Sequence, residues 1–264
     1  MISWKQIGVR RGPMWGERLG AKLLKSDGNI MAWMERHTQV LKSDKHSTVG
    51  LLELEQQACY LKYYRHKSWA QRALFQLGIG RGFRSFDGAL ALLEKHVPVP
   101  EPLSCVLIPG GMLLLTQAMQ PSCDLKAEWL DGPDANRKAE LMANAGLALH
   151  RLHVAGYCHG DSKWSNFLWS QGQFYLVDLE AVESVAADVL GSKKQARDIA
   201  RFVLNAEDLS LTPAEFEPFM HAYLDQSKVS EKALIGAIMP ALNRLRRRHD
   251  KHYGARGTRL IGEQ

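Results

Sequence analysis

The chain has 264 residues and a mass of 29.7 kDa, a size that suits one domain or two small lobes. Hydrophobic residues make up 45% and charged residues 23%, and 22 Gly with 10 Pro are too few for a low-complexity chain, so wholesale disorder is excluded. Lys and Arg number 34 against 28 Asp and Glu, and the net charge of +6 indicates an anionic partner.

The positive charge is concentrated at the carboxy-terminal end, where residues 241–264 carry +5 and the rest of the chain only +1. The cations of this basic segment are Arg244, Arg246, Arg247, Arg248, Lys251, Arg256 and Arg259. Such a segment is compatible with acidic lipid headgroups, phosphorylated glycan or nucleic acid, and equally with a solvated helix face. Nucleic acid is not the expected partner, because Tyr253 is the one aromatic residue among these cations.

The cysteines and the first residues predict a cytoplasmic protein. Cys59, Cys105, Cys123 and Cys158 form no CxxC pair and are expected to be free thiols in a reducing compartment. The start, MISWKQIGVRRG, lacks the apolar run of a signal peptide, and no window approaches the ~18 apolar residues that span a bilayer. Any membrane contact is therefore expected to be peripheral, on the cytoplasmic face of the inner membrane.

The amino-terminal half predicts a small sheet with one or two helices. Residues 33–64 read as three antiparallel strands, with Lys62 inside the third, where a lysine is ordinarily exposed. Ser68 is expected to cap a helix that ends at Gly78.

Further along this half, a helix is expected over residues 86–96, and it must stop before the alternating prolines at 98, 100 and 102. The apolar runs 103–109 and 112–119, joined by two glycines, predict a hairpin.

The carboxy-terminal half predicts mainly helices. Apolar residues at three- and four-residue spacing indicate a helix over 136–155, and the runs FLW and FYLV around SQGQ predict a small hairpin. Thr212, followed by Pro213 and Glu215, forms the pattern of a capping box that opens another helix. Pro240 is expected to kink or end the last apolar helix before the basic segment.

The stretch HGDSKWSN over residues 159–166, followed by Asp178, carries the chemistry that phosphoryl transfer needs. Such a site must orient a hydroxyl with a carboxylate, place a cation on the moving phosphate and hold a divalent metal by oxygen ligands. Asp161 can orient the hydroxyl and accept its proton, and Lys163 can neutralise the moving phosphate. Asn166 and Asp178, the latter 178 − 161 = 17 residues beyond Asp161, can hold Mg²⁺.

This order of residues resembles the catalytic and metal loops of protein-kinase-like folds, with Lys62 at the strand position of the lysine that binds the ATP phosphates. The resemblance covers roughly residues 33–204. It implies an α+β, two-lobed kinase-like fold with a small antiparallel-sheet lobe over 1–117 and a mainly helical lobe over 118–264. The lobes are expected to meet near residues 116–119, with ATP in the cleft and Gln117 and Met119 as cofactor-binding residues.

Within that superfamily the chain resembles the bacterial lipopolysaccharide kinases, which phosphorylate heptose or Kdo sugars of the inner core. The matching segments are TVGLLELEQQACYLKYY, GRGFRSFDGALALLEKHVPVPEPL, LHVAGYCHGDSKWSNFLW, FYLVDLEAV and ARDIARF. The resemblance implies ATP and Mg²⁺ as cofactors and a lipopolysaccharide core sugar, most of all heptose, as the acceptor. It also implies Asp161 as the catalytic base and Asp198 as a helix residue that braces the catalytic loop.

Several residues depart from the protein-kinase pattern. Gly160 replaces the arginine that pairs with a phosphorylated activation loop, and no peptide-docking segment follows, which favours a small hydroxyl acceptor. No GxGxxG precedes Lys62, and Ser85 stands where the helix glutamate that pairs with this lysine is expected. Asp87 and Glu94 are the candidate substitutes.

Two other functions stay open: a kinase for another small molecule, with Kdo or an aminoglycoside-like acceptor, and a pseudokinase scaffold without turnover. Several other patterns have simpler structural explanations. GIGRG follows a helix and reads as a flexible connector, and His150, His153, Cys158 and His159 do not have the spacing of a closed zinc site. Trp164 and Trp169 are expected to pack in the core or at its rim, with stacking on a sugar as the alternative.

Overall fold

The computed structural model describes residues 7–24, 29–66, 68–185, 192–225, 227, 229–254 and 258–262. The chain forms two compact units. Unit 1 comprises Met1–Leu93 and Pro100–Gln120, and unit 2 comprises Glu94–Val99 and Pro121–Gln264. The mixed α and β architecture agrees with the prediction, whereas a lobe boundary between residues 117 and 118 stays a prediction.

Unit 1 is built on an antiparallel sheet, which in the described residues has six strands in the order β1-β5-β6-β4-β3-β2. The strands are β1 (Gly8–Arg11), β2 (Gln39–Ser43), β3 (Ser47–Leu54), β4 (Gln57–Arg65), β5 (Pro102–Ile108) and β6 (Gly111–Gln117). The three strands predicted before residue 65 are β2 to β4, and the predicted hairpin is β5 with β6, so both predictions are confirmed.

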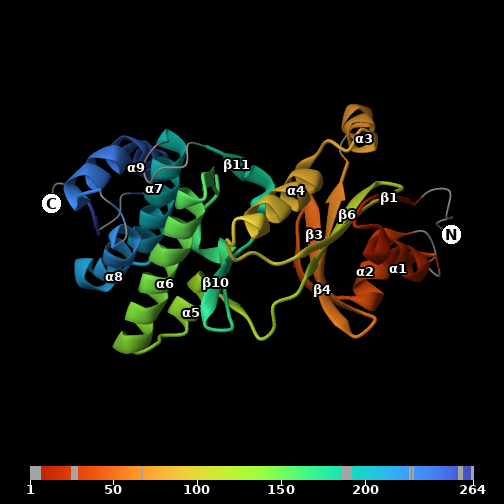
Figure 1. Cartoon of the computed structure of the whole chain (residues 1–264), viewed down its shortest axis with the longest axis horizontal. Helices are drawn as coiled ribbons and strands as arrows, with labels where there is room; N and C mark the ends of the chain where they lie inside the picture. Colours follow the sequence, from red (N-terminus) through yellow and green to blue (C-terminus); the bar gives the residue numbers. More distant parts are fainter. Residues whose placement is uncertain are drawn as a thin grey trace. The chain divides into compact units, whose positions relative to one another are not determined.

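Helices cover both faces of this sheet (Figure 1). On one face, α1 (Pro13–Leu23) and α2 (Ile30–His37) bury apolar side chains against the strands. On the other face, α3 (Trp69–Gln76) and α4 (Arg81–Glu94) contribute Phe75, Phe83 and Phe86 to a second cluster. The Ser68 cap is confirmed, because its side chain accepts a hydrogen bond from the backbone N–H of Gln71.

Two predicted boundaries in unit 1 are wrong. Residue 33 lies in α2 rather than in a strand, because Asn29 caps that helix and Trp33 is buried under the sheet. Helix α4 starts at Arg81 instead of residue 86, so part of the expected GIGRG connector is helical. Gly82 permits this start, since a side chain there would collide with Met112 and Tyr64 on the sheet.

Unit 2 is mainly helical. Its helices are α5 (Leu125–Leu130), α6 (Ala135–Val154), α7 (Lys193–Asp208), α8 (Pro213–Leu224) and α9 (Glu231–Tyr253). Short strands form two small sheets: β7 (Cys123–Asp124) with β9 (Phe167–Ser170) and β10 (Gln173–Leu176), and β8 (Tyr157–Cys158) with β11 (Glu183–Ser184). The predicted helix over 136–155, the β9–β10 hairpin and the Thr212 capping box are confirmed.

Pro240 was predicted to kink or end the last apolar helix. The helix does not end there, because α9 continues through it to Tyr253, and a kink stays a prediction. Proline removes one intrahelical hydrogen bond and costs about 3 kcal/mol or more in a helix interior. Buried residues on both sides of it offset that cost: Leu234 and Ile238 before the proline, Leu242 and Arg246 after it, at four-residue spacing along the face that packs on α7. The basic segment is therefore largely a continuation of α9.

One arginine of the basic segment is not on the surface. Arg246 is buried and forms an ion pair with buried Glu207 of α7, and it also donates to the backbone oxygen of Ile261 at 2.7 Å. The backbone N–H of Leu260 donates to Glu207 at 3.1 Å. The expectation that the basic segment is a solvated helix face is therefore wrong for Arg246. Arg256 lies outside the described residues. In the described parts of both units, no helix is both long and apolar enough to cross a membrane.

Candidate active site

The loop over residues 159–166 follows β8 and is held in place by α7. Asp198 of α7 is buried, and its carboxylate accepts hydrogen bonds from the backbone N–H groups of His159 (2.6 Å) and Gly160 (2.9 Å). Ser162 donates to the backbone oxygen of Asp198 at 2.7 Å. The bracing role that the resemblance implies for Asp198 is confirmed by these contacts.

Helix α7 contacts the same loop at a second place, about two turns after Asp198. Asn205 accepts a hydrogen bond from the backbone N–H of Trp164 at 3.0 Å, and the indole of Trp164 donates to the backbone oxygen of Phe202 at 3.2 Å. Trp164 is fully buried, so it is a packing residue and has no face for a sugar. Trp169 is half-buried and stacks beneath the guanidinium of Arg137, 4.3 Å from its ring centre.

Asp161 lies between two cations. Lys163 Nζ is 3.0 Å from Oδ2 of Asp161, and Arg201 of α7 forms an ion pair with Oδ1. Asn166 donates to the backbone oxygen of Asp161 at 2.8 Å. Burial acts to raise the pKa of Asp161, but the hydrogen bonds and charges of Lys163 and Arg201 outweigh it and hold the pKa below its usual range. The carboxylate is therefore ionised at neutral pH.

His159 connects this loop to the segment that carries Asp178. Its Nε2 donates to the backbone oxygen of Val177 at 3.1 Å, and its Nδ1 accepts from the backbone N–H of Asp161 at 3.3 Å. Complete burial lowers the pKa of His159, which agrees with this neutral form. The N–H of Val177 also donates to the backbone oxygen of Asn166 at 3.0 Å, so Asp178 follows directly after a residue bonded to the loop.

Asp178 and Gly160 both have a backbone conformation with positive φ. Asp178 has φ 62° and ψ 52°, a left-handed conformation that is uncommon outside glycine and occurs most often in Asn, Asp and His. Gly160 has φ 76°, and a side chain on it would lie 2.7 Å from the backbone oxygen of Ala181. The glycine that departs from the protein-kinase pattern is thus required by the close approach of the segment after Asp178.

The residues present suit a magnesium ion. Because the amide nitrogen of Asn166 donates to Asp161, its amide oxygen is left as an acceptor, and Asp178 adds a carboxylate. Mg²⁺ prefers such oxygen ligands and commonly takes one or two from the protein, with the remainder from water and substrate phosphates. No group of three or more His, Cys, Asp or Glu that could hold a metal occurs in the described ranges.

The predicted ATP-binding residues belong to unit 1. Lys62 is half-buried in β4, which is paired on both sides, with Val49 of β3 and Leu114 of β6 as its neighbours. The strand lysine is thus in the middle of the sheet, not at an exposed edge. Gln117, at the end of β6, pairs with Cys59 on the same strand as Lys62.

Met119 is buried just beyond β6, and its backbone oxygen accepts a hydrogen bond from Tyr60 at 3.3 Å. The backbone N–H of Gln117 donates to the backbone oxygen of Glu101 at 2.9 Å. Asp87, a candidate partner for Lys62, is paired with Arg11 at 2.9 and 3.2 Å. Arg11 reaches α4 from β1, a contact that no pattern in the sequence predicted. Glu94 is exposed at the end of α4.

The histidines considered for zinc have other partners. His150 Nδ1 donates to the backbone oxygen of Tyr223 at 2.8 Å, and His153 Nδ1 lies 2.7 Å from the Tyr223 hydroxyl. His153 Nε2 is 3.4 Å from Asp198, so this network reaches the residue that braces the loop. These contacts give the buried histidines a structural role in joining α6, α7 and α8.

His150 is expected to make the stability of the chain depend on pH. Burial lowers its pKa, so on acidification the unfolded chain takes up a proton that the folded chain does not, and stability is lost as pH falls below about 6.5. Between about pH 7 and pH 5.5 the free energy of unfolding should therefore decrease. Urea unfolding at both pH values should show a smaller loss in His150→Gln. The exposed His252→Gln should behave as wild type, and an unchanged pH dependence in His150→Gln would contradict the assignment.

A cavity of about 630 Å³ lies elsewhere in unit 2. Its lining includes Phe216, Met220, Leu224, Ile235, Leu260 and Ile261, and none of the predicted site residues is among its lining residues.

Sequence reasoning missed two residues of the site, Arg201 and Asn205. Together with Asp198 they recur at three and seven residues along α7, and this spacing puts them on one side of the helix. The polar residues of ARDIARFVLN at this spacing were the available signal. What could not be read from spacing is that this side of α7 faces the loop over 159–166.

A sheet unit with a lysine on a central strand, and a helical unit with a braced HGDSKWSN loop, define a protein-kinase-like fold. A solved structure described as WaaP in complex with acyl carrier protein matches with a TM-score of 0.59 and 16% identity, over 94% of this chain and 99% of that chain, and confirms the predicted fold class. No curated protein matches the sequence. The family model described as lipopolysaccharide kinase (Kdo/WaaP) family matches residues 31–223. The chain therefore belongs to the lipopolysaccharide kinase (Kdo/WaaP) family.

Proposed function

We propose that the protein is an ATP-dependent kinase that phosphorylates a sugar of the lipopolysaccharide inner core, with heptose as the acceptor. The observation that carries the proposal is the Asp161 carboxylate, held ionised beside Lys163 and Asn166 in a loop braced by α7. Family membership supports a lipopolysaccharide kinase. The choice of heptose rests on the resemblance of the HGDSKWSN loop and the VDLE segment.

In the proposed reaction, Asp161 orients the acceptor hydroxyl. The lowered pKa makes this carboxylate a weak base, so it receives the proton late, after most of the bond to phosphorus has formed. A bond forms between the acceptor oxygen and the γ-phosphorus, the bond from that phosphorus to the bridging oxygen of ADP breaks, and the hydroxyl proton passes to Asp161. Lys163 neutralises the transferring phosphate.

The other predicted residues take binding roles in this proposal. Lys62, Gln117 and Met119 bind ATP, with Lys62 on its phosphates. Asn166 and Asp178 hold Mg²⁺, which when bound neutralises phosphate charge and fixes the geometry of the triphosphate.

Mass spectrometry of lipopolysaccharide tests the acceptor. Cells that lack the protein should lose a phosphate from core heptose, and wild-type protein should restore it while Asp178→Ala should not. If core heptose phosphate is unchanged by the deletion, the heptose assignment is wrong. A missing phosphate on Kdo instead would identify the other sugar acceptor.

The absence of phosphate transfer by the purified protein would favour a pseudokinase scaffold. A purified wild-type protein that transfers no phosphate from Mg-ATP to lipopolysaccharide of the deletion strain, yet still binds ATP, would support that function. Transfer that is lost in Asp161→Asn would support catalysis.

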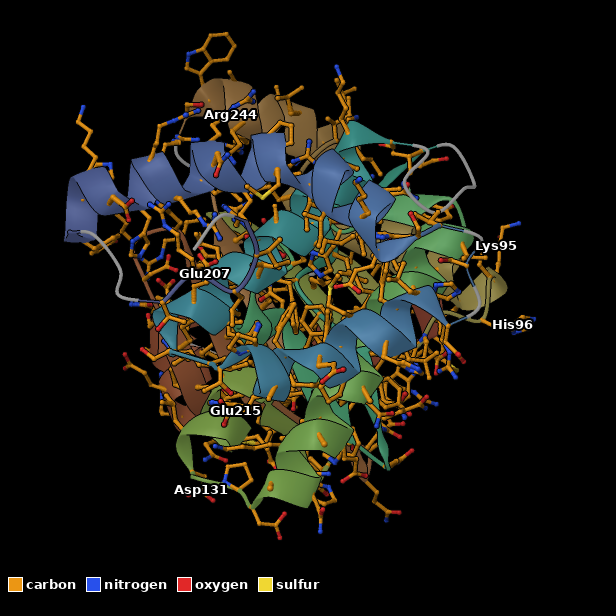
Figure 2. All side chains as sticks on the ribbon, turned by 90° about the vertical axis from the view of Figure 1, so that its left-hand side faces the viewer. Lys95, His96, Asp131, Glu207, Glu215 and Arg244 are labelled. Atoms are coloured by element: carbon orange, nitrogen blue, oxygen red, sulfur yellow. The ribbon has the colours of Figure 1, made fainter. Side chains whose placement is uncertain are left out.

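We further propose that α9 attaches the protein peripherally to the cytoplasmic face of the inner membrane. Arg244, Arg247, Arg248 and Lys251 are exposed and recur three, four and seven residues after the first, which places them on one side of the helix. In Figure 2, Arg244 lies on one side of α9 and Glu207 on the other. We name these four cations the α9 stripe. Clustered cations of this kind favour anionic lipid headgroups.

Vesicle sedimentation tests the α9 stripe. Replacing its four cations by Gln should weaken binding to phosphatidylglycerol vesicles by at least about tenfold, and salt should weaken the binding of wild type. The matched control replaces four exposed lysines elsewhere, Lys42, Lys45, Lys95 and Lys126, with the same charge change. Equal losses in the two variants would show that net charge, not the stripe, is responsible.

An acyl carrier protein is a second partner that we propose for this chain. The support is the likeness to WaaP, whose structure was solved in complex with acyl carrier protein, over 94% of the present chain. Affinity purification of the tagged chain from its own cells, with mass spectrometry of what co-purifies, tests this. Absence of acyl carrier protein from the purified material would contradict it.

A further inference from the structure

Arg201 contacts the proposed catalytic carboxylate from a rigid position. It lies on α7 one turn after Asp198 and one turn before Asn205, and both of these neighbours are hydrogen-bonded to the loop that carries Asp161. Its guanidinium forms an ion pair with Oδ1 of Asp161. The segment that presents Arg201 is thus fixed to the loop on either side of the contact.

Lys163, the other cation on Asp161, is in a different situation. Its Nζ contacts Oδ2, and its side chain is 38% exposed, at the end of a flexible stem. Each carboxylate oxygen therefore has one cation beside it in the free chain, and release of Lys163 leaves the lone pairs of Oδ2 more open to an acceptor hydroxyl. Lys163 can leave Asp161, because the transferring phosphate is its second proposed partner. Arg201 stays in place, because its helix is fixed to the loop.

We propose that Arg201 is a positioning residue: it keeps Oδ1 of Asp161 in place, so that Oδ2 faces the acceptor hydroxyl once Lys163 has moved to the phosphate. This inference rests on the proposed kinase function and adds a residue to its site. The guanidinium suits this role because it stays charged and contacts Oδ1 only, which leaves Oδ2 for the hydroxyl. Orientation of this kind commonly accounts for large factors in rate.

Steady-state kinetics with Mg-ATP and lipopolysaccharide from the deletion strain provide the first test. Arg201→Gln should lower kcat by about 10- to 100-fold and leave the KM for ATP and for lipopolysaccharide within about twofold of wild type. Arg201→Lys should recover part of the loss. Arg197→Gln is the matched control, since Arg197 is exposed on the same helix, and it should keep wild-type kinetics.

The decisive comparison is a double-mutant cycle with Asp161. Because Arg201 is proposed to act through Asp161, Arg201→Gln should cost no further activity in the Asp161→Asn protein. A loss of the same size in both backgrounds would overturn the proposal. So would a raised KM for lipopolysaccharide at unchanged kcat, which would make Arg201 a contact to an anionic group of the acceptor.

A second cycle separates this inference from the proposed function. Urea unfolding of the same four proteins needs no acceptor, and a non-additive effect of Asp161→Asn and Arg201→Gln on the unfolding equilibrium is expected if the two side chains are paired. If the wild type is inert toward lipopolysaccharide but the cycle is non-additive, the kinase function fails and the positioning contact stands. Additivity in unfolding would overturn the contact itself.

Discussion

Asp161→Asn is expected to lower phosphate transfer by about 10²- to 10⁴-fold while leaving the protein folded. The amide has the size of the carboxylate but cannot receive the hydroxyl proton, and it no longer attracts Lys163 and Arg201. The two cations lose their shared anion, but all three side chains are partly exposed and water screens them, so we expect a small change in stability and a large change in rate. The measurement is kcat with Mg-ATP and lipopolysaccharide from the deletion strain, with thermal unfolding to verify the fold.

Asp131→Asn is the matched control for this prediction. Asp131 is exposed at the end of α5 and belongs to none of the predicted site positions, so its variant should keep wild-type activity. Full activity in Asp161→Asn would remove the carboxylate from the mechanism and with it the proposed reaction. A variant that is inactive because it is unfolded would be recognised by its thermal transition.

Asp198→Ala is expected to lower the free energy of unfolding by at least about 1–3 kcal/mol, the cost of leaving the buried N–H of His159 without an acceptor; the partly buried N–H of Gly160 loses its acceptor as well. The loop over 159–166 should lose its anchor to α7, so activity should fall as well. Asp198→Asn should be milder, since the amide oxygen can still accept one of the two hydrogen bonds. Urea unfolding and hydrogen exchange of the two backbone amides measure these effects.

Arg197→Ala is the control on the same helix. Its side chain is exposed one residue before Asp198, and a surface substitution of this kind should change stability by no more than about 0.5 kcal/mol. If Asp198→Ala were equally mild, the loop would have to be held by the Asn205 and Phe202 contacts and by the hydrogen bond from Ser162 to the backbone of residue 198, and the bracing role of the Asp198 carboxylate would be refuted.

Much of the fold could be predicted because its signals are local. The alternating burial of β3, the Ser68 cap, the Thr212 capping box and the apolar spacing of α6 each depend on residues within a few positions of one another. The same holds for the HGDSKWSN loop, whose residue types and order predict a phosphotransfer site.

The sequence by itself thus determined the two-part architecture, the loop and the candidate residues for hydroxyl, phosphate and metal. Tertiary structure alone decided which side of α7 faces Asp161, that Arg246 is buried against Glu207, and that α9 passes through Pro240. Arg201 and Asp161 are 40 residues apart, and Arg246 and Glu207 are 39 apart. The partner of a charge at such separation depends on how helices pack, because packing brings distant residues together without leaving a pattern in either segment.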